Sequence, residues 1–176
     1  MKERLFMIQT PRLSLQPVSD DDLEEVVELL CNDEIKQTYM VPDFPSREDA
    51  VRMFERFMQL SHAKDRFVYG VKLEGKLIGL LNEVDINDGA IEVGYVIHPA
   101  HKNNGYATEV LQAALQELFR MGYHVVRAGI FEENAASRRV IEKCGMELID
   151  LEEDIEYRGK THHCIYFERE NPTPKD

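Results

Sequence analysis

Cysteine is scarce in this sequence, and its placement argues against cross-linking and metal binding. Cys31, Cys144 and Cys164 are far apart, odd in number and outside any Cys-x-x-Cys arrangement. Disulfide frameworks use an even set of cysteines, and structural zinc sites use closely spaced pairs. The sequence therefore predicts reduced thiols, with neither a disulfide scaffold nor a zinc site.

Long hydrophobic runs are also missing. No stretch approaches the ~18 uninterrupted apolar residues that a membrane helix needs. The N-terminal segment MKERLFMIQTPRL carries only a short, broken apolar run, unlike the continuous core of a secretory signal. We expect no membrane association and a cytoplasmic location.

Positive charge is outweighed by negative charge, with 21 Lys and Arg against 33 Asp and Glu and a formal net charge of -12. Nucleic-acid binding needs a basic surface, so no nucleic-acid partner is expected. An acidic protein is compatible with a cationic amine as substrate. The length of 176 residues suits one domain, which we place at 1–170, followed by a disordered tail at 171–176.

Apolar spacing in the first half predicts strand, helix, helix and then three strands. Residues 10–18 alternate and indicate a strand, and apolar positions every three or four residues predict helices after the capping residues Ser19 and Ser46. From residue 66 the period becomes two, with tight turns at 74–75 and 88–89. Three antiparallel strands are expected there.

The second half alternates between helices and strands. A helix is predicted from Gly105 to about Met121, and the strand HVVRAGIF after it should lie parallel to AIEVGYVI because a helix connects them. A short helix at 134–143 and a hairpin of 146–157 with 161–169 complete the pattern. The sequence predicts an α/β fold with a mixed sheet.

The segment VIHPAHKNNGYATEVLQ holds the most informative pattern. A strand ends, a polar loop follows and a helix begins, so unpaired backbone N–H groups should face outward at the positive end of the helix dipole. Gly105 and the small Ala107 would let an anion approach the backbone. The alternative is an ordinary strand-to-helix turn.

A family resemblance supports the anion site. HKNNGYA, residues 101–107, resembles the Q/R-x-x-G-x-G/A acetyl-CoA loop of the GNAT acetyltransferases, and the chain is similar to their RimJ/RimL-type branch nearly end to end. The segments TPRLSLQPVSDDDLEEV, IEVGYVIHP, NAASRRVIEKCGM and EYRGKTHHCIYFER carry the likeness. It implies a mostly antiparallel seven-stranded sheet with a splayed parallel pair and about four helices.

Three positions depart from the family pattern. Lys102 stands where Gln or Arg is usual, which keeps a donor but changes its geometry. Asn103 replaces a common glycine, and Met146 replaces a phenylalanine. Coenzyme binding should survive, because the family's contacts come mainly from backbone amides.

The resemblance implies acetyl-CoA as co-substrate and an amine as acceptor, with no metal and with a homodimer left open. Backbone N–H groups near Val96 and Ile97 would polarise the thioester carbonyl. The residues expected to bind the coenzyme are Val96, Ile97, Lys102, Asn103, Asn104, Gly105, Tyr106, Ala107, Thr108, Asn134 and Arg138.

Acyl transfer also needs a base, because an unperturbed lysine-type amine has a pKa of about 10.4. Glu92 is the first candidate and Glu83 the second, each with the alternative of a solvent-facing carboxylate on a strand. Many GNAT enzymes use a tyrosine as the acid for the leaving thiolate, and Ile141 stands at that place here. The resemblance to the RimJ/RimL-type branch implies that Ser137, three residues after Asn134, takes this role.

Each candidate in the short helix predicted at 134–143 has a simpler interpretation. Asn134 suits a helix N-cap, Ser137 is commonplace in a first turn, and Arg138 and Arg139 fit a solvated helix face as well as a phosphate contact. Cys144 at a helix C-terminus lacks the positive surroundings of a nucleophile.

The function expected is direct acetyl transfer to an amine in a ternary complex. The alternative is a catalytically silent acyl-CoA sensor of the same fold. A P-loop nucleotide site is disfavoured, since the loop lacks G-K-[ST]. The acceptor would be selected by the loops at 32–46 and 152–163.

Overall fold

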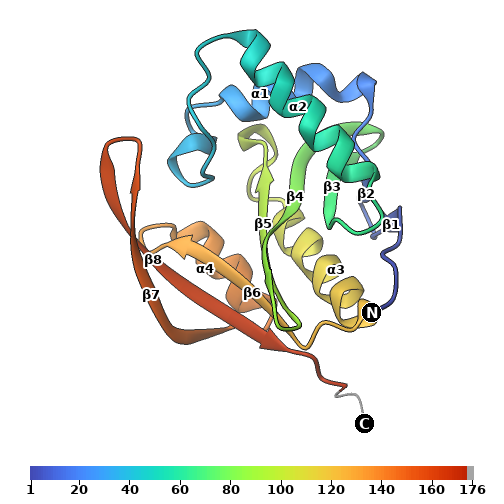
Figure 1. Cartoon of the computed structure of the whole chain (residues 1–176), viewed down its shortest axis with the longest axis vertical. Coiled ribbons are helices and arrows are strands. Elements are labelled where there is room, and N and C mark those ends of the chain that lie inside the picture. The colour runs from blue at the N-terminus through green and yellow to red at the C-terminus, as the bar shows by residue number, and fades with distance from the viewer. Residues whose placement is uncertain (174–176) are drawn as a thin grey trace.

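The alternating segments form one eight-stranded sheet in the computed structural model, which describes residues 1–173 (Figure 1). The order across this sheet is β1-β2-β3-β4-β5-β6-β8-β7, and β5 with β6 is its parallel pair. The strands are β1 (Ile8–Gln9), β2 (Ser14–Gln16), β3 (Val68–Leu73), β4 (Lys76–Asn87), β5 (Ala90–Ile97), β6 (Val125–Phe131), β7 (Glu147–Tyr157) and β8 (Lys160–Glu170).

The expected α/β class with a mixed, mostly antiparallel sheet is confirmed. The strand beyond the expected seven is the two-residue β1, which pairs with β2. The strand expected at 10–18 is shorter than its alternation suggests, because Thr10 N–H donates to Leu13 O and closes a turn before β2 begins.

Four α-helices cover the two faces of the sheet (Figure 1). They are α1 (Leu23–Cys31), α2 (Arg47–His62), α3 (Tyr106–Met121) and α4 (Ala135–Lys143). The helix pair α1 and α2 packs on β4 and β3, while α3 and α4 pack on β5 and β6 from the other side. The 3-10 turns η1 (Asp20–Asp22), η2 (Ile35–Gln37) and η3 (Pro99–His101) lie in the connections.

The helix ends mostly follow the local sequence signals. Ser46 caps α2 as expected, since its side chain accepts a hydrogen bond from Asp49 N–H at 3.3 Å. Gly122 ends α3 with a left-handed φ of 107° that an L side chain rarely adopts. Ser19 instead begins the turn η1, and α1 starts four residues later.

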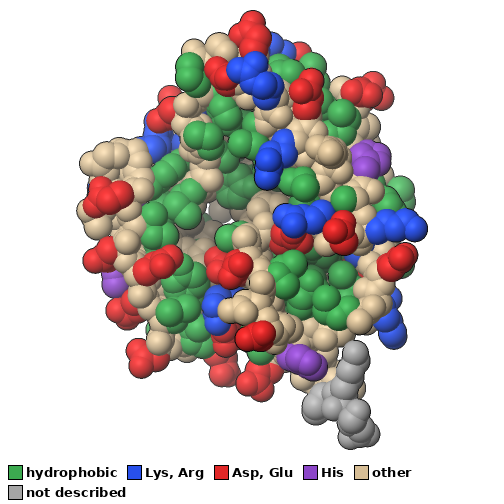
Figure 2. Space-filling view, viewed as in Figure 1, with side chains coloured by type: hydrophobic (Ala, Val, Ile, Leu, Met, Phe, Trp, Pro, Cys, Tyr) green, Lys and Arg blue, Asp and Glu red, His purple; other side chains and the backbone are tan. Residues whose placement is uncertain are grey.

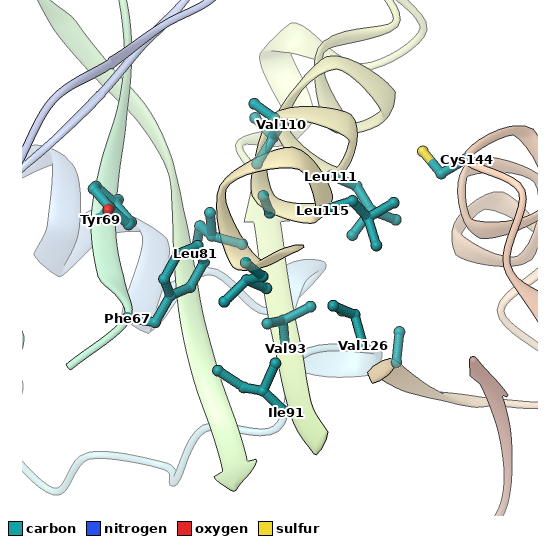
Figure 3. Packing of buried hydrophobic residues seen from close by; sticks show 14 of the residues in the cluster. Phe67, Tyr69, Leu81, Ile91, Val93, Val110, Leu111, Leu115, Val126 and Cys144 are labelled. Atoms are coloured by element: carbon teal, nitrogen blue, oxygen red, sulfur yellow. The ribbon is translucent and has the colours of Figure 1, made fainter. Parts of the chain in front are cut away.

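The larger core lies between α3 and the sheet (Figure 3). Val110, Leu111 and Leu115 of α3 belong to one cluster with Ile91 and Val93 of β5, and all of these side chains are buried. Burying each such side chain contributes roughly 1.5–3 kcal/mol. On the opposite face, a second cluster joins α1 and α2 to β4 and β5; it contains Val26, Leu30, Phe54, Leu77, Leu80 and Val96.

The parallel pair separates along its length. β5 and β6 are paired only from Ala90 with Val125 to Glu92 with Arg127. Beyond that point β5 stays with β4 as far as Ile97, while β6 follows β8 as far as Phe131. The expected splay is therefore present, and it opens a wedge beside the start of α3.

The residue that follows β8, Asn171, is hydrogen-bonded to the rest of the fold. Asn171 N–H donates to His124 O at 2.8 Å, and the Asn171 side chain donates to Phe119 O and Tyr123 O. The tail was expected to be disordered over 171–176; of these, 174–176 lie outside the described residues.

Candidate active site

A cavity of about 550 Å³ occupies the wedge between the splayed strands. Four segments line it: the loop after α1, the end of β5, the start of α3 with its preceding loop, and α4. The lining residues are Glu34, Ile35, Gln37, Thr38, Tyr39, Tyr95, Val96, Ile97, Pro99, His101, Lys102, Asn103, Gly105, Tyr106, Ala107, Thr108, Asn134, Ala136, Ser137, Arg139, Val140 and Lys143.

The N-terminus of α3 is open to this cavity. Gly105 is its N-cap, with a left-handed φ of 78° and no side-chain cap. Within residues 1–173, the backbone N–H groups of 103–108 donate to no protein acceptor. A row of free amides at the positive end of a helix dipole is a binding site for an anion such as a diphosphate.

The polar loop before α3 has the shape that its sequence requires. Asn103 has a φ of 60°, a conformation that asparagine tolerates better than most residues, so it can replace a glycine here. Asn104 donates to His101 O and Lys102 O at 3.1 and 2.9 Å. Its side chain therefore shapes the turn and is absent from the cavity lining, in contrast to its neighbours.

Arg12 holds this loop from outside the cavity. Its Nη1 donates to Asn104 O at 2.7 Å, its Nε pairs with Glu109 at 2.8 Å, and its guanidinium lies 4.6 Å from the centre of the Tyr106 ring. No local signal could have predicted this contact, since Arg12 is 92 residues from Asn104. The loop is thus fixed to the first strands of the sheet.

Lys102 joins two walls of the cavity. Its ammonium pairs with the Glu34 carboxylate in the loop after α1. Both side chains are about half exposed, so solvent screens the pair and its stabilising effect is small. The cation nevertheless lies in the lining, beside the open amides.

The end of β5 presents backbone donors to the wedge. His98 N–H donates to Ile78 O at 2.7 Å, and the register pairs Val96 with Leu80. Because N–H groups alternate between the two sides of an extended strand, the Val96 amide faces β4 and the Ile97 amide faces the wedge. Two backbone amides were expected to polarise the thioester, those of Val96 and Ile97. Of these, the Ile97 N–H points toward the wedge, where the thioester would lie.

The start of α4 forms the opposite wall. Asn134 caps this helix, accepting from Ser137 N–H at 3.2 Å, and both side chains line the cavity. Arg138 lies outside the lining: its Nε pairs with Glu142 at 2.9 Å and its guanidinium lies over the Phe167 ring. Arg139, one position along, is in the lining.

Glu83 is engaged inside the protein. Its carboxylate accepts from Phe67 N–H at 2.7 Å and pairs with Arg66 at 2.7 Å, and its side chain is only 6% exposed. It lies near Tyr123, which follows the C-terminal end of α3, and it does not line the cavity. These contacts leave little freedom for proton transfer.

The Glu92 carboxylate has no hydrogen bond or ion pair with any group in the described part of the chain; its neighbour Arg127 pairs with Glu168 instead. It is the last residue of β5 paired with β6, so it lies where the wedge begins, although it is outside the cavity lining. Burial raises the pKa of Glu92; nearby Arg127 opposes the rise, and Asp85 and Glu153 add to it.

Gly129 makes room for this carboxylate. A Cβ added there would lie 3.3 Å from Glu92 Oε1 and 2.6 Å from the Tyr166 ring. The second distance is shorter than real Cβ contacts, so any larger residue would displace Tyr166. The absence of a side chain thus lets Glu92 and Tyr166 share the face of the sheet that α1 and α2 also cover.

Two tyrosines in the lining were not among the sequence candidates. Tyr39, in the loop after α1, donates to Asn82 Oδ1 at 2.6 Å. Tyr95 lies on β5, and its hydroxyl is buried without a hydrogen-bond partner among residues 1–173. The alternation of IEVGYVI, which places Tyr95 on the same face as Val93 and Ile97, was a signal that could have identified Tyr95.

The two loops expected to select the acceptor contact each other. Tyr157 OH, at the tip of the β7–β8 hairpin, donates to Val41 O at 3.0 Å, and Arg158 pairs with Asp43 at 3.3 Å. In the same view as Figure 1, the surface has a hollow near its centre with acidic side chains below it (Figure 2). These loops therefore enclose one side of the approach to the wedge.

A cysteine nucleophile and a metal site find little support in the described residues. Burial raises the pKa of Cys144 to about 11, which keeps it a neutral thiol. Across residues 1–173, no three His, Cys, Asp or Glu side chains gather as a metal site would require. Over the same residues, none of the helices has the length and apolar character needed to cross a membrane.

Comparisons with known proteins agree with this geometry. Residues 12–147 match the family model of the acetyltransferase (GNAT) domain. The uncharacterized N-acetyltransferase YoaA of Bacillus subtilis is 30% identical over 146 residues, which cover 80% of this chain and 82% of YoaA.

Solved structures share the fold. A GNAT-family acetyltransferase from Bacillus anthracis superposes with a TM-score of 0.81 at 24% identity, covering 95% of this chain and 99% of that one. The ribosomal L7/L12 α-N-protein acetyltransferase RimL, in complex with coenzyme A, gives 0.80 at 19% identity, with 93% and 97% covered. The expected family is confirmed: the chain belongs to the GNAT acetyltransferases and is an acetyl-CoA-dependent acetyltransferase.

Proposed function

We propose that this protein moves the acetyl group of acetyl-CoA to a primary amine, by direct transfer while both substrates are bound. One observation carries the proposal: the uncapped N-terminus of α3 opens into a cavity between two splayed strands. The amides of 103–108 would hold the CoA diphosphate, and Lys102 and Arg139 would add positive charge beside it.

The acetyl end of the coenzyme would lie between β5 and α4. The Ile97 amide would donate to the thioester carbonyl and stabilise the oxyanion that forms on attack. Asn134 and Ser137 face this position from α4. Ser137 would then donate to the sulfur as the carbon–sulfur bond breaks.

We propose Glu92 as the base, in preference to Glu83. A carboxylate whose pKa is raised by burial is better matched to accept a proton near neutral pH. Its freedom from internal partners supports the role, whereas Arg66 and Phe67 occupy Glu83. Because Glu92 lies outside the lining, a water molecule would relay the proton from the amine.

The acceptor would enter beside the loop after α1 and the β7–β8 hairpin. The acidic side chains around the hollow would attract its positive charge (Figure 2). The acceptor class is a primary amine, either a protein N-terminus or a small molecule. The name of RimL describes an α-amino group of a ribosomal protein as its acceptor, which places protein N-termini in the test panel.

Thiol release from acetyl-CoA across a panel of amines tests the activity. The panel should contain N-terminal peptides, polyamines, aminoglycosides and amino acids, and a chelator should leave the rate unchanged. The competing function is an acyl-CoA sensor. It is favoured by the buried Ile141, which stands where many GNAT enzymes have a tyrosine that acts as the general acid. Calorimetric CoA binding without thiol release for any amine would support the sensor and contradict the proposed enzyme.

We also propose a cytoplasmic location. The support is chemical: Cys31, Cys144 and Cys164 are all free thiols. Proteins of oxidising compartments more often pair their cysteines. Cell fractionation with a tagged copy of the full chain checks this, and recovery outside the cytoplasm would contradict it.

A further inference from the structure

Among the buried side-chain nitrogen and oxygen atoms of residues 1–173, one lacks a hydrogen-bond partner, the hydroxyl oxygen of Tyr95. Leaving a buried hydroxyl unpaired is unfavourable, so each case needs an explanation such as a ligand or a catalytic role. Tyr95 also lines the cavity proposed to hold the acetyl end of the coenzyme, so a ligand or catalytic explanation is the one to examine.

Three other tyrosines that are at least partly buried have their hydroxyls satisfied. Tyr69 donates to Leu5 O at 2.5 Å, Tyr39 donates to Asn82 at 2.6 Å, and Tyr166 donates to Glu153. Tyr95 therefore differs from tyrosines that serve the packing of the fold. Its ring is fixed against the main core while its hydroxyl is left without an internal acceptor.

Ser137 is the hydroxyl side chain that faces Tyr95 across the wedge. Burial raises the pKa of Tyr95, and the nearby Ser137 side chain opposes that rise. The two groups are close enough to influence each other, but they do not form a hydrogen bond of good geometry. A small rotation of the serine would complete one.

We propose that Tyr95 is a positioning residue for the leaving group: its hydroxyl donates to Ser137 Oγ and so directs the serine hydrogen toward the coenzyme sulfur. This inference rests on the proposed function. The carbon–sulfur bond breaks with its electron pair on sulfur, and the thiolate accepts the hydrogen bond from Ser137. Both hydroxyls keep their protons, and the thiolate takes a proton from solvent after release.

This arrangement accounts for the missing acid on α4. Ile141 is fully buried and offers no hydroxyl to the thiolate. A lone serine has one hydrogen and several acceptors to choose from, including backbone carbonyls of its own helix. A donor fixed on β5 occupies the serine oxygen and leaves the serine hydrogen for the sulfur. Tyrosine suits this task because burial keeps its hydroxyl neutral.

A double-mutant cycle tests the coupling. Tyr95→Phe should lower kcat about tenfold, the effect of losing the neutral hydrogen bond that orients Ser137, with KM for acetyl-CoA within about twofold. Ser137→Ala should lower kcat at least as much, and the double variant should be no worse than Ser137→Ala alone. Unchanged kcat in Tyr95→Phe, or effects of the two changes that multiply, would overturn the proposal.

Stability separates positioning from packing. Tyr95→Phe should leave Tm unchanged or raise it, because no internal hydrogen bond is lost. The matched control is Tyr123→Phe, a buried tyrosine of the same core cluster that does not line the cavity; it should keep the wild-type kcat. A lower Tm in Tyr95→Phe with the same loss of kcat would assign Tyr95 a structural role instead.

A titration of bound CoA keeps the test independent of the acceptor. The ultraviolet absorbance of the CoA thiolate in the complex reports the thiol pKa, which should be higher in Tyr95→Phe than in wild type because a hydrogen bond to the thiolate is weakened. The same pKa in both proteins would overturn the role of Tyr95. Absence of thiol release by wild type would contradict only the proposed function.

Discussion

The helices α2 and α3 have the same length, 16 residues, but begin in opposite ways. Ser46 caps α2, and Glu48 and Asp49 place negative charge in its first turn. Gly105 leaves α3 without a side-chain cap, and Glu109 in its first turn is held by Arg12. The protein satisfies one helix dipole internally and leaves the other open to an anion.

The same contrast separates other chemically similar residues. Glu83 is paired with Arg66, whereas Glu92 has no partner within the described residues. Tyr69 donates to Leu5 O, whereas the Tyr95 hydroxyl has no acceptor. Groups with internal partners should therefore contribute to stability, and unpartnered groups at the wedge should contribute to binding and turnover.

The largest effect should follow from closing the open helix end. Gly105→Glu should weaken CoA binding by more than about 100-fold, which corresponds to about 2.7 kcal/mol. The new side chain would meet a left-handed φ of 78°, place its Cβ 3.3 Å from Arg12 Nη2, and repel the diphosphate. Isothermal titration calorimetry with CoA measures the loss.

Gly75→Glu is the matched control for that variant. Gly75 also has a positive φ, 83°, but nothing lies within 4 Å of the position that its Cβ would take. It should show similar backbone strain with unchanged CoA affinity. Equal affinities of the Gly105 and Gly75 variants would contradict the assignment of the diphosphate site.

The next effect concerns the unpartnered carboxylate. Glu92→Gln should lower kcat by about 100-fold, the lower range for loss of a general base. Turnover in the wild type should fall as pH drops through the raised pKa of Glu92, because the base must be ionised. This acidic limb, measured as kcat against pH, should disappear in Glu92→Gln.

The stability of the fold should depend on the ionisation of Glu92 in the direction opposite to turnover. Its pKa is higher in the folded state, so ionisation disfavours folding and the stability associated with the neutral carboxyl is lost as pH rises through that pKa. Glu92→Gln should therefore be at least as stable as wild type at neutral pH. A lower Tm together with an unchanged kcat would contradict the proposed role.

Glu83→Gln should show the reverse pattern. It weakens the pair with the partly exposed Arg66 and the hydrogen bond that Phe67 N–H donates to the buried carboxylate, at a cost of about 1–3 kcal/mol. Urea unfolding measures this loss, while kcat should stay within about twofold after correction for folded protein. A large drop in kcat of the folded variant would transfer the base role to Glu83.

The smallest effect should follow from removing a cap that the protein supplies. Ser46→Ala should destabilise the fold by about 1 kcal/mol, because Asp49 N–H loses its acceptor. CoA affinity should not change, since the start of α2 does not line the cavity. A drop in affinity would show that the two helix ends are not independent.

Local sequence signals were sufficient for much of the fold. Ser46, Gly105 and Gly122 act within one turn of their own positions, so the ends of α2 and α3 could be read directly. The hairpin turns at 74–75 and 88–89 depend on neighbouring residues in the same way. The loop before α3 could be predicted from the sequence for the same reason.

Other features depend on contacts between distant segments. A β-bulge between Glu83 and Asp85 shifts the register of β4 against β5, so counting by twos could not assign a common face to Glu83 and Glu92. Arg139 lines the cavity and Arg138 does not, because α4 is rotated so that Arg138 lies over Phe167 of β8. The pairing of Arg12 with the loop before α3 joins segments that only the folded sheet brings together.

The central claim is that the open amides of α3 bind the CoA diphosphate. Backbone amide chemical shifts, measured by NMR with and without CoA, compare the two helix ends in one experiment. If these amides hold the diphosphate, the signals of residues 103–108 should shift strongly and those of residues 47–49, at the capped start of α2, should not shift. Shifts confined to other parts of the chain, with 103–108 unmoved at saturating CoA, would contradict it.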